Sequence, residues 1–194
     1  MTDAMRIEDL RATGALMDGH FLLTSGRHGD RFMLLAKLLA EPARAWPWIR
    51  DLAQFAEKLH PDRVVGPAMG GVILAWAVAS EMPSRPRAAF AEKSEIAGGG
   101  KAMVIRRGLA PSPGERVLVV EDAMTTGGSV MLTAQAVEEA GAQVVGVATL
   151  VDRRPENFNI PYPTYGVLRM LTAAWTPEDC PLCVEKVPLV SPKS

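Results

Sequence analysis

The chain has 194 residues, 48% of them hydrophobic and 22% charged, which is typical of one soluble globular domain with a sizeable core. Its net charge of −1 gives no electrostatic reason to expect a nucleic acid or an anionic membrane surface as a partner. No apolar run reaches the ~18 residues of a membrane-spanning helix, and the N-terminus lacks a charged-then-apolar signal pattern, so we expect a cytoplasmic protein.

The N-terminal part of the chain predicts a short helix over residues 7–16 and then a hairpin over residues 19–33. In the hairpin, two apolar patches flank a turn that carries Ser, Gly, Arg, His and Asp. A second helix is expected over residues 42–59. Its aromatic and aliphatic residues, such as Trp48 and Leu52, fall at helical spacing and predict a side that faces the core.

Residues 62–72 predict a buried strand, a loop of small residues and the start of a helix. A glycine-containing turn alone is weak evidence of a binding site, but two such loops at strand ends can converge on one ligand in an open α/β sheet. The helix that follows, over residues 72–82, is nearly all apolar, and we expect it to be buried on most of its sides.

A short strand is expected over residues 87–91, and a glycine-rich segment follows at residues 94–101. Three consecutive glycines make this segment too flexible to form an ordered element by itself. It is either a surface hairpin without a function or a lid that closes over a site and excludes water. The basic residues available to such a lid are Lys93, Lys101, Arg106 and Arg107. The two arginines fit a solvated strand end equally well.

The most informative stretch runs from Val117 to Ser129. Four apolar residues, three of them β-branched, predict a buried central strand of a parallel sheet. The acidic pair Glu121 and Asp122 follows, then Thr-Thr-Gly-Gly-Ser, and then an amphipathic helix. Free N–H groups and the dipole at a helix start favour a bound phosphate. The carboxylates can accept hydrogen bonds from sugar hydroxyls or hold a divalent cation.

An ordinary strand-to-helix turn capped by Ser or Thr is the alternative for this stretch. It does not explain the acidic pair, because two carboxylates at the end of a buried strand lose hydration and repel each other. The stretch is not a Walker A loop, and it lacks the Gly-x-Gly-x-x-Gly dinucleotide fingerprint. We therefore expect a ligand with phosphate at one end and a diol with a metal at the other.

Another buried strand is predicted over residues 143–151, followed directly by Asp152, Arg153 and Arg154. If the strands are parallel, this end lies at the same sheet edge as the earlier loops. An arginine there can bind a carboxylate through two hydrogen bonds, although a surface basic pair is the simpler alternative.

The proline-rich tail predicts one last strand within residues 164–171 and then carries Cys180-Pro-Leu-Cys183. A lone Cys-x-x-Cys supplies only half of a zinc site. Reduced thiols in a tail, or a dimer contact, are therefore favoured over a metal or redox role.

The sequence Val-Val-Glu-Asp-Ala-Met-Thr-Thr-Gly-Gly-Ser at residues 119–129 resembles the phosphoribosyl-pyrophosphate (PRPP) motif of type I phosphoribosyltransferases. Leu-Thr-Ser-Gly-Arg-His-x-Asp-Arg followed by an aromatic, at residues 23–32, is similar to the N-terminal segment of the orotate enzymes of that family. The PRPP motif is specific for the superfamily and does not choose the base.

The resemblance implies an α/β fold with an open, mostly parallel central sheet flanked by helices. It implies one phosphoribosyltransferase domain over residues 1–194, with a core of about 42–155. The remaining segments, about 1–41 and 156–194, would form a small hood over the base site.

The resemblance also carries three groups of site residues over to this chain. In that family the acidic pair meets the ribose hydroxyls, and the Thr-Thr-Gly-Gly-Ser loop holds the 5′-phosphate. The PRPP-binding residues would be Ala68, Met69, Gly70, Lys93, Glu121, Asp122, Ala123, Met124, Thr125, Thr126, Gly127, Gly128 and Ser129. The catalytic residues would be Lys93, Lys101 and Asp122. The orotate-binding residues would be Phe32, Thr125 and Arg153.

The activity that the resemblance implies is transfer of the phosphoribosyl group of PRPP to orotate, which gives orotidine 5′-monophosphate and pyrophosphate. Mg²⁺ would be the cofactor. It would be brought by PRPP, and Glu121 and Asp122 could also hold it. The implied assembly is a homodimer whose lids reach into the neighbouring active site. No nucleic acid or membrane is expected as a partner.

The chain departs from the family pattern most in the lid. Some members carry an arginine where Glu92 stands, and a lysine and a histidine where Ile96 and Gly98 stand. Some also carry a lysine where Thr24 or Gly70 stands. These departures leave two alternatives open: a phosphoribosyltransferase for another base, and a non-catalytic PRPP-sensing regulator that kept the site and lost the lid chemistry.

Overall fold

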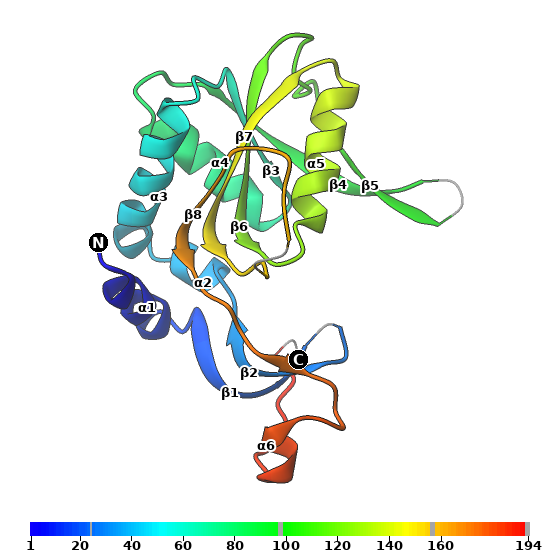
Figure 1. Ribbon diagram of the computed structural model, residues 1–194. Coiled ribbons are helices and arrows are strands. Elements are labelled where there is room, and N and C mark those ends of the chain that lie inside the picture. The colour runs from blue at the N-terminus through cyan, green and yellow to red at the C-terminus, as the bar shows by residue number, and fades with distance from the viewer. Residues whose placement is uncertain (24, 97–98, 156–157, 193–194) are drawn as a thin grey trace. The chain divides into compact units, whose positions relative to one another are not determined.

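The computed structural model describes residues 1–23, 25–96, 99–155 and 158–192 (Figure 1). Thr24 and Gly98, two positions at which the sequence departs from the family pattern, lie outside the described residues. None of the described helices is long and apolar enough to cross a membrane. The chain folds into two compact units, which are described in turn.

The larger unit, Ala43–Arg169, is built on one sheet of six strands. These strands are β3 (Arg63–Pro67), β4 (Arg87–Ile96), β5 (Gly100–Val104), β6 (Arg116–Met124), β7 (Gln143–Asp152) and β8 (Thr164–Arg169). They lie in the order β5-β4-β3-β6-β7-β8, and all neighbours are parallel except β4 and β5. The predicted open, mostly parallel sheet is confirmed, with β6 near its centre.

Three helices flank this sheet: α3 (Pro42–Glu57), α4 (Gly70–Glu81) and α5 (Gly128–Glu139) (Figure 1). Helix α4 packs against β3, β4 and β6, and helix α5 packs against β5, β6 and β7. Val117 and Val119 of β6 share a buried core with Val130 of α5. Leu118 points to the opposite face and is equally buried. Strand β6 is therefore covered on both faces, as its continuous apolar run predicts.

One expectation about this unit is wrong in detail. The strand expected over 117–120 continues to Met124, so the acidic pair lies within β6, where Glu121 pairs with Thr149 of β7. Helix α4 is buried on most of its sides, as expected, but Ile73 and Trp76 form a stripe that is 57% and 64% exposed. A helix that packs on one face of a sheet leaves its far side open, whatever its sequence.

The glycine-rich segment 94–101 is more ordered at its ends than its composition predicts. Strand β4 runs to Ile96, and β5 begins at Gly100 and pairs with it in an antiparallel hairpin. The ladder of cross-strand hydrogen bonds supplies order that a glycine-rich sequence lacks alone. The hairpin that the sequence offered as one interpretation is therefore present in the described residues, and its order comes from the pairing of β4 with β5.

The smaller unit consists of Met1–Pro42 and Met170–Ser194. Its sheet has the order β1-β2-β9, and both pairings are antiparallel. The bounds are β1 (Leu16–Leu22), β2 (His28–Met33) and β9 (Ala174–Trp175), and the helices are α1 (Asp3–Ala12), α2 (Ala36–Leu39) and α6 (Pro181–Val184). The β1–β2 pair is the hairpin that the sequence predicts.

Helix α1 begins and ends earlier than expected. Thr2 caps its start by accepting a hydrogen bond from the backbone N–H of Met5 at 3.3 Å. Gly14, in the left-handed region at φ +67°, follows its end, and Leu16 already belongs to β1. A side-chain cap that favours an earlier start explains why the apolar spacing alone misplaces this helix.

The C-terminal tail is attached to β1 by backbone hydrogen bonds. The N–H of Val190 donates to the carbonyl of His20 at 2.8 Å, and the N–H of Leu22 donates to the carbonyl of Val190 at 2.9 Å. No residue of helix α6 itself is buried. The sequence did not predict β9 or α6, because elements of two and four residues carry too little periodicity to recognise.

Candidate active site

The turn between β6 and α5 forms a cradle of exposed backbone and hydroxyl groups. Gly127 takes the left-handed conformation at φ +63° and precedes the first turn of α5, which no side chain caps. Thr125, Thr126 and Gly128 are exposed around it. The first N–H groups of a helix have no partner within the helix, so this end is suited to an anion.

A cavity of about 560 Å³ opens beside this cradle, inside the larger unit. Its walls come from the β4–β5 hairpin, the end of β6, the cradle and the first turns of α5. The lining residues are Lys93, Ser94, Glu95, Lys101, Ala102, Met103, Glu121, Ala123, Thr125, Thr126, Gly127, Gly128, Ser129 and Leu132. The lid lysines and the phosphate loop, which the sequence predicts separately, thus line one cavity.

The register of the hairpin explains why both lysines line this cavity. Lys93 pairs with Met103 and Glu95 pairs with Lys101, so all four side chains point to the same face of the two strands. Both lysines are exposed and carry flexible charges toward the cradle. Sequence reasoning missed Glu95 and Met103, and the alternation of side chains along a paired hairpin is the signal that would have found them.

The two other basic candidates of this region are held along the hairpin. Arg107 forms an ion pair with Glu92 at 3.2 Å, and Arg106 donates to Ser94 Oγ at 3.3 Å. Neither arginine lines the cavity. The solvated strand end, which the sequence left open as an alternative for this pair, is the interpretation that these contacts favour.

The acidic pair is half-buried and divided between two sides of β6. Burial, followed by the charge of Asp122, raises the pKa of Glu121 to about 7, against smaller opposing effects of Ser129 and Lys93. Burial likewise raises the pKa of Asp122, although its Oδ1 accepts a hydrogen bond from the backbone N–H of Ala123 at 2.8 Å. Because neighbouring residues of a strand point to opposite faces, Glu121 lines the cavity and Asp122 does not.

Asp122 instead lies against the second predicted loop. A Cβ added at Gly70 would come within 2.7 Å of the Asp122 carboxyl carbon, so only glycine fits there without a shift. The Met69 side chain is 86% exposed, and the backbone N–H of Ala68 donates to the Ala91 carbonyl at 2.8 Å. The backbone N–H of Ala68 is therefore already paired within the protein.

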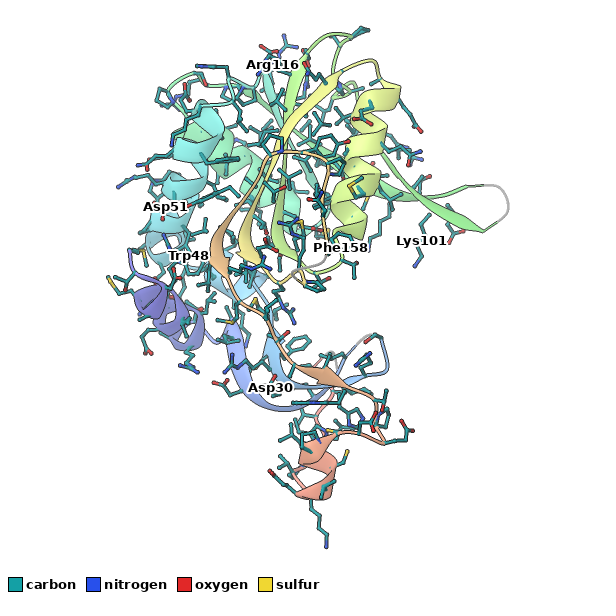
Figure 2. All side chains as sticks on the ribbon, viewed as in Figure 1. Asp30, Trp48, Asp51, Lys101, Arg116 and Phe158 are labelled. Atoms are coloured by element: carbon teal, nitrogen blue, oxygen red, sulfur yellow. The ribbon has the colours of Figure 1, made fainter. Side chains whose placement is uncertain are left out.

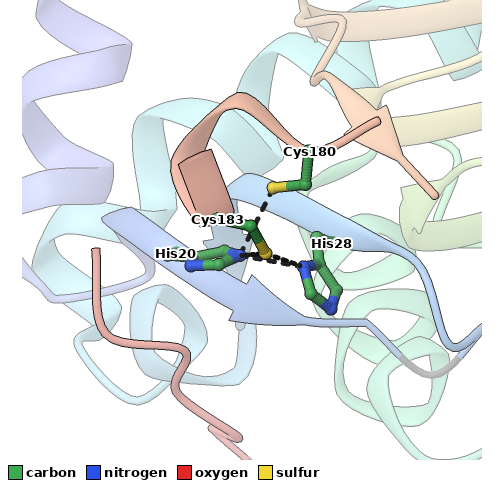
Figure 3. A group of neighbouring side chains, drawn as sticks. All are labelled: His20, His28, Cys180 and Cys183. Carbon is green, nitrogen blue, oxygen red and sulfur yellow. Dashed lines mark hydrogen bonds between the residues drawn. The ribbon is translucent and has the colours of Figure 1, made fainter. Parts of the chain in front are cut away.

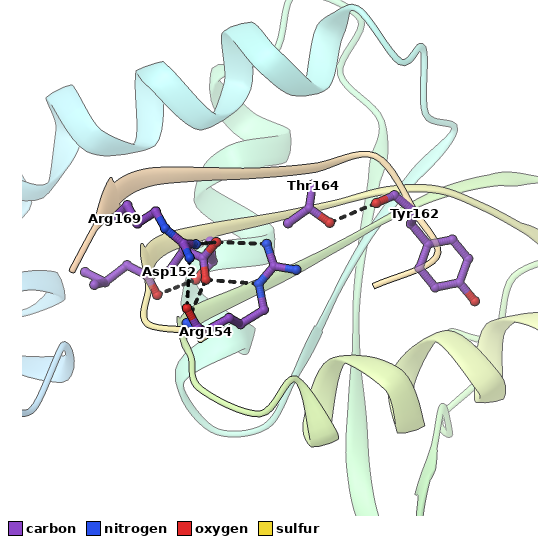
Figure 4. A network of polar contacts seen from close by, with 7 residues as sticks. Asp152, Arg154, Tyr162, Thr164 and Arg169 are labelled. Atoms are coloured by element: carbon purple, nitrogen blue, oxygen red, sulfur yellow. Dashed lines mark hydrogen bonds and ion pairs between the residues drawn. The ribbon is translucent and has the colours of Figure 1, made fainter. Parts of the chain in front are cut away.

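The carboxyl end of β7 carries a network of arginines, shown in Figure 4. Asp152 accepts hydrogen bonds from Arg154 at 2.8 and 3.0 Å and from Arg169 at 3.1 Å. Burial acts to raise the pKa of Asp152, but these arginines outweigh it and hold that pKa below its usual range. The charge of Arg154 is therefore already balanced within the protein.

Arg153 has a different setting from Arg154. Its backbone N–H donates to the carbonyl of Met124 at 2.8 Å, which fixes it beside the end of β6. Burial lowers the pKa of Arg153, but an arginine keeps its charge. It is not among the residues that line the cavity. The side chain of Met124 is fully buried, so only its backbone is available at the site.

Phe32, the predicted residue beside the base, belongs to β2 of the smaller unit. Its ring lies 5.8 Å from that of Phe21, centroid to centroid. Its role toward a ligand therefore stays a prediction. The side chain of Ile96, another position of the lid pattern, lies outside the described residues.

Comparison with known proteins identifies the family. A model of the phosphoribosyl transferase domain matches residues 38–183. The chain is 41% identical over 187 residues to the orotate phosphoribosyltransferase of Thermotoga maritima, with 96% of each chain covered. It is 42% identical over 176 residues to that of Caldanaerobacter subterraneus subsp. tengcongensis, with 91% of this chain and 89% of the relative covered. The chain belongs to the orotate phosphoribosyltransferase family.

A solved structure of the same family has the same fold. The orotate phosphoribosyltransferase of Mycobacterium tuberculosis, in complex with inorganic phosphate, superposes with a TM-score of 0.68 at 28% identity. The match covers 86% of this chain and 95% of that chain. The type I phosphoribosyltransferase fold expected from the sequence is thus confirmed.

Proposed function

We propose that this protein transfers the phosphoribosyl group of PRPP to orotate and releases pyrophosphate, with its own cavity residues in the roles set out below. The observation that carries the proposal is the single cavity in which Lys93 and Lys101 meet Glu121 and the phosphate cradle. Membership of the orotate phosphoribosyltransferase family supports orotate as the acceptor.

The cradle would bind the 5′-phosphate of PRPP. The hydroxyls of Thr125, Thr126 and Ser129 and the uncapped N–H groups of α5 are the donors that a phosphate needs. Lys93 and Lys101 would bind the diphosphate and neutralise the charge that develops on it as it leaves. Backbone N–H groups of Met69 and Gly70 would complete the diphosphate site, since the N–H of Ala68 already donates to Ala91.

The acidic pair would hold the ribose. Glu121 and Asp122 would accept hydrogen bonds from its two hydroxyls and stabilise the positive charge that develops at the anomeric carbon. Burial raises the pKa of both carboxyls, and repulsion by Asp122 raises that of Glu121 further; a bound cation would relieve both effects. Carboxylate oxygens are ligands that Mg²⁺ prefers, so the pair fits the cofactor. When bound, Mg²⁺ would lower the charge on the leaving diphosphate.

Arg153 would orient the base. Its backbone is anchored to the end of β6, and a guanidinium can bind the carboxylate of orotate through two hydrogen bonds. Thr125 would contribute to the same subsite. This assignment accounts for the choice of a carboxylated pyrimidine.

A homodimer is part of the proposal. Ile73 and Trp76 of α4, and Met69 directly before it, are exposed. Their spacing places them on one face of the helix, and a second copy of this chain would cover that face. The family resemblance also implies a lid shared between subunits. Sedimentation should show a dimer that Trp76→Glu dissociates, and a wild-type monomer with full activity would contradict lid sharing.

The proposal also places the protein in the cytoplasm. PRPP is a multiply charged phosphate ester that does not cross a bilayer unaided. The reaction therefore belongs to the compartment in which PRPP is made.

A base panel tests the reaction directly. The purified protein with PRPP and Mg²⁺ should consume orotate and release pyrophosphate, while uracil, adenine and hypoxanthine should give no product. Consumption of another base, with the absorbance of orotate unchanged, would contradict orotate as the acceptor. Binding of PRPP without pyrophosphate release, with every base tested, would instead support a non-catalytic PRPP sensor.

A further inference from the structure

Four metal-binding side chains meet in the smaller unit, as Figure 3 shows. They are His20 of β1, His28 of β2, Cys180 and Cys183, the last of these in helix α6. Their ligand atoms all lie within 4.8 Å of one another. We propose that this His₂Cys₂ cluster binds a structural Zn²⁺ ion.

The distances within the cluster fit a tetrahedral zinc site. Nε2 of His20 lies 2.9 Å from Nδ1 of His28, and the Sγ atom of Cys183 lies 3.7 and 3.2 Å from these two nitrogens. Sγ of Cys180 lies 3.4 Å from His20 Nε2. Zinc bonds of about 2.3 Å to sulfur and about 2.0–2.1 Å to nitrogen place tetrahedral ligand atoms about 3.3–3.8 Å apart. To enclose the ion, the two nitrogens 2.9 Å apart would separate and the widest spacing, up to 4.8 Å, would contract toward this range.

The protonation of His20 suits this role. Its other ring nitrogen, Nδ1, lies 2.8 Å from the backbone carbonyl of Val187, which can only accept a hydrogen bond. Nδ1 therefore carries the proton, and Nε2 presents its lone pair to the other three side chains. A metal-bound histidine commonly donates its second N–H to a carbonyl in this way, which fixes the ring in place.

Ordinary hydrogen bonding does not account for the cluster equally well. His20, His28 and Cys180 are 2%, 6% and 0% exposed, so their polar atoms have lost water and need strong partners. A thiol is a weak donor and a weak acceptor, and the two cysteines are not joined in a disulfide. Two thiolates and two neutral imidazoles around one Zn²⁺ satisfy all four groups at once, and S₂N₂ tetrahedral sites select zinc.

The fold gives the ion a structural task. The C-terminal tail has little apolar attachment, because no residue of α6 is buried and Val184 is 79% exposed. Zinc would join this tail to both strands of the β1–β2 hairpin. Small units with few buried apolar residues commonly rely on such a metal. Four protein ligands leave no open position for a substrate, which is typical of structural sites.

The first test measures metal on the purified full-length protein by elemental analysis. After production in zinc-supplemented medium, the wild type should carry about one zinc ion per chain, as a closed four-ligand site requires. Cys183→Ser should lose that ion. Cys183 is the exposed member of the cluster, so its replacement leaves the core packing intact.

Competition with a chromophoric chelator measures affinity. Cys183→Ser and His28→Gln should each weaken zinc binding by more than roughly 100-fold, since disturbing an outer partner alone costs up to that much. The matched control is His60→Asn, at an exposed histidine outside the cluster. His60 has a positive φ, a backbone conformation that asparagine tolerates. It should bind zinc as the wild type does. With Co²⁺ in place of zinc, only the wild type and this control should show tetrahedral d–d bands and a thiolate charge-transfer band.

Hydrogen exchange tests the structural task. Removing zinc should speed amide exchange in β1, β2 and residues 180–190 and leave β6 unchanged. A reduced wild-type protein that takes up no zinc on reconstitution would overturn the proposal. So would Cys183→Ser and His28→Gln variants that hold as much zinc as the wild type, or a zinc ion whose removal leaves exchange in β1 and the tail unchanged. None of these readouts depends on transferase activity.

Discussion

The two units bury ionisable side chains in opposite ways. In the larger unit, Glu121 and Asp122 lie at the end of a strand whose apolar residues are covered on both faces, and Glu121 lines an open cavity. In the smaller unit, His20 and His28 turn toward two cysteines and toward each other. A large apolar core lets the first unit tolerate carboxylates that repel each other, whereas the second uses its polar groups as a cross-link.

This difference separates activity from stability. Substitutions at the acidic pair should reduce activity while the fold keeps or gains stability, because both carboxyls are destabilised by burial. Substitutions in the His₂Cys₂ cluster should loosen the fold of the smaller unit. In the larger unit, substitutions and pH should therefore separate activity from stability.

The largest effect is expected at the acidic pair. Asp122→Asn and Glu121→Gln should each lower kcat/KM by about 10²–10³-fold, the cost of removing one group that stabilises a charged transition state. Their thermal unfolding midpoints should equal or exceed that of the wild type. Steady-state kinetics and thermal unfolding measure the two quantities.

The matched control for the acidic pair is Glu139→Gln, on the exposed face of α5 and outside the cavity. It should leave both activity and stability unchanged. Full turnover by Asp122→Asn would remove the ribose assignment. Loss of activity together with a large loss of stability would show that the pair is structural.

A smaller effect is expected from the lid. Lys93→Ala and Lys101→Ala should each lower kcat/KM by about 10–100-fold, because a charge-assisted contact to the diphosphate is worth about 1.5–3 kcal/mol. The exposed Lys58→Ala serves as the control and should behave as the wild type. If both cavity lysines can be removed without effect on PRPP turnover, the hairpin is not the lid.

The smallest effect concerns pH. The pKa of Glu121 is raised from 4.5 to about 7 in the folded protein, so the folded state binds more protons between these values. The resulting stability is complete below pH 4.5 and is lost as the pH rises through about 7. The free energy of unfolding of the ligand-free protein should therefore fall by up to about 3 kcal/mol across this window.

Denaturant titrations of wild type and Glu121→Gln at several pH values check this slope. Glu121→Gln should remove most of it, since glutamine does not titrate. A wild-type slope that the variant keeps would assign the titration to another group.

The sequence predicted the parts of the larger unit whose signals are local. The apolar run of β6 and the Thr-Thr-Gly-Gly-Ser turn identify a buried strand and a phosphate cradle without any tertiary information. The division of the acidic pair was not predicted, because it follows from the continuation of β6 through Glu121 and Asp122. The order of the hairpin around Gly100 depends on cross-strand pairing, which composition does not report.

The smaller unit shows why half of a site can be invisible in a sequence. Cys180 and Cys183 form a recognisable pair, but their proposed co-ligands lie about 160 positions away, as His20 and Cys180 illustrate. The two histidines face the tail only after the β1–β2 hairpin forms and Val190 pairs with β1. Long-range backbone contacts therefore assemble this cluster, and no spacing rule predicts it.

We expect PRPP to bind in the cavity that the lysines, Glu121 and the cradle line, with its ribose also reaching Asp122. A crystal structure with PRPP and Mg²⁺ tests it most directly. The 5′-phosphate should lie on residues 125–129, the ribose hydroxyls on Glu121 and Asp122, and the diphosphate beside Lys93 and Lys101. A 5′-phosphate bound outside the cradle, or a ribose without contact to either carboxylate, would contradict it.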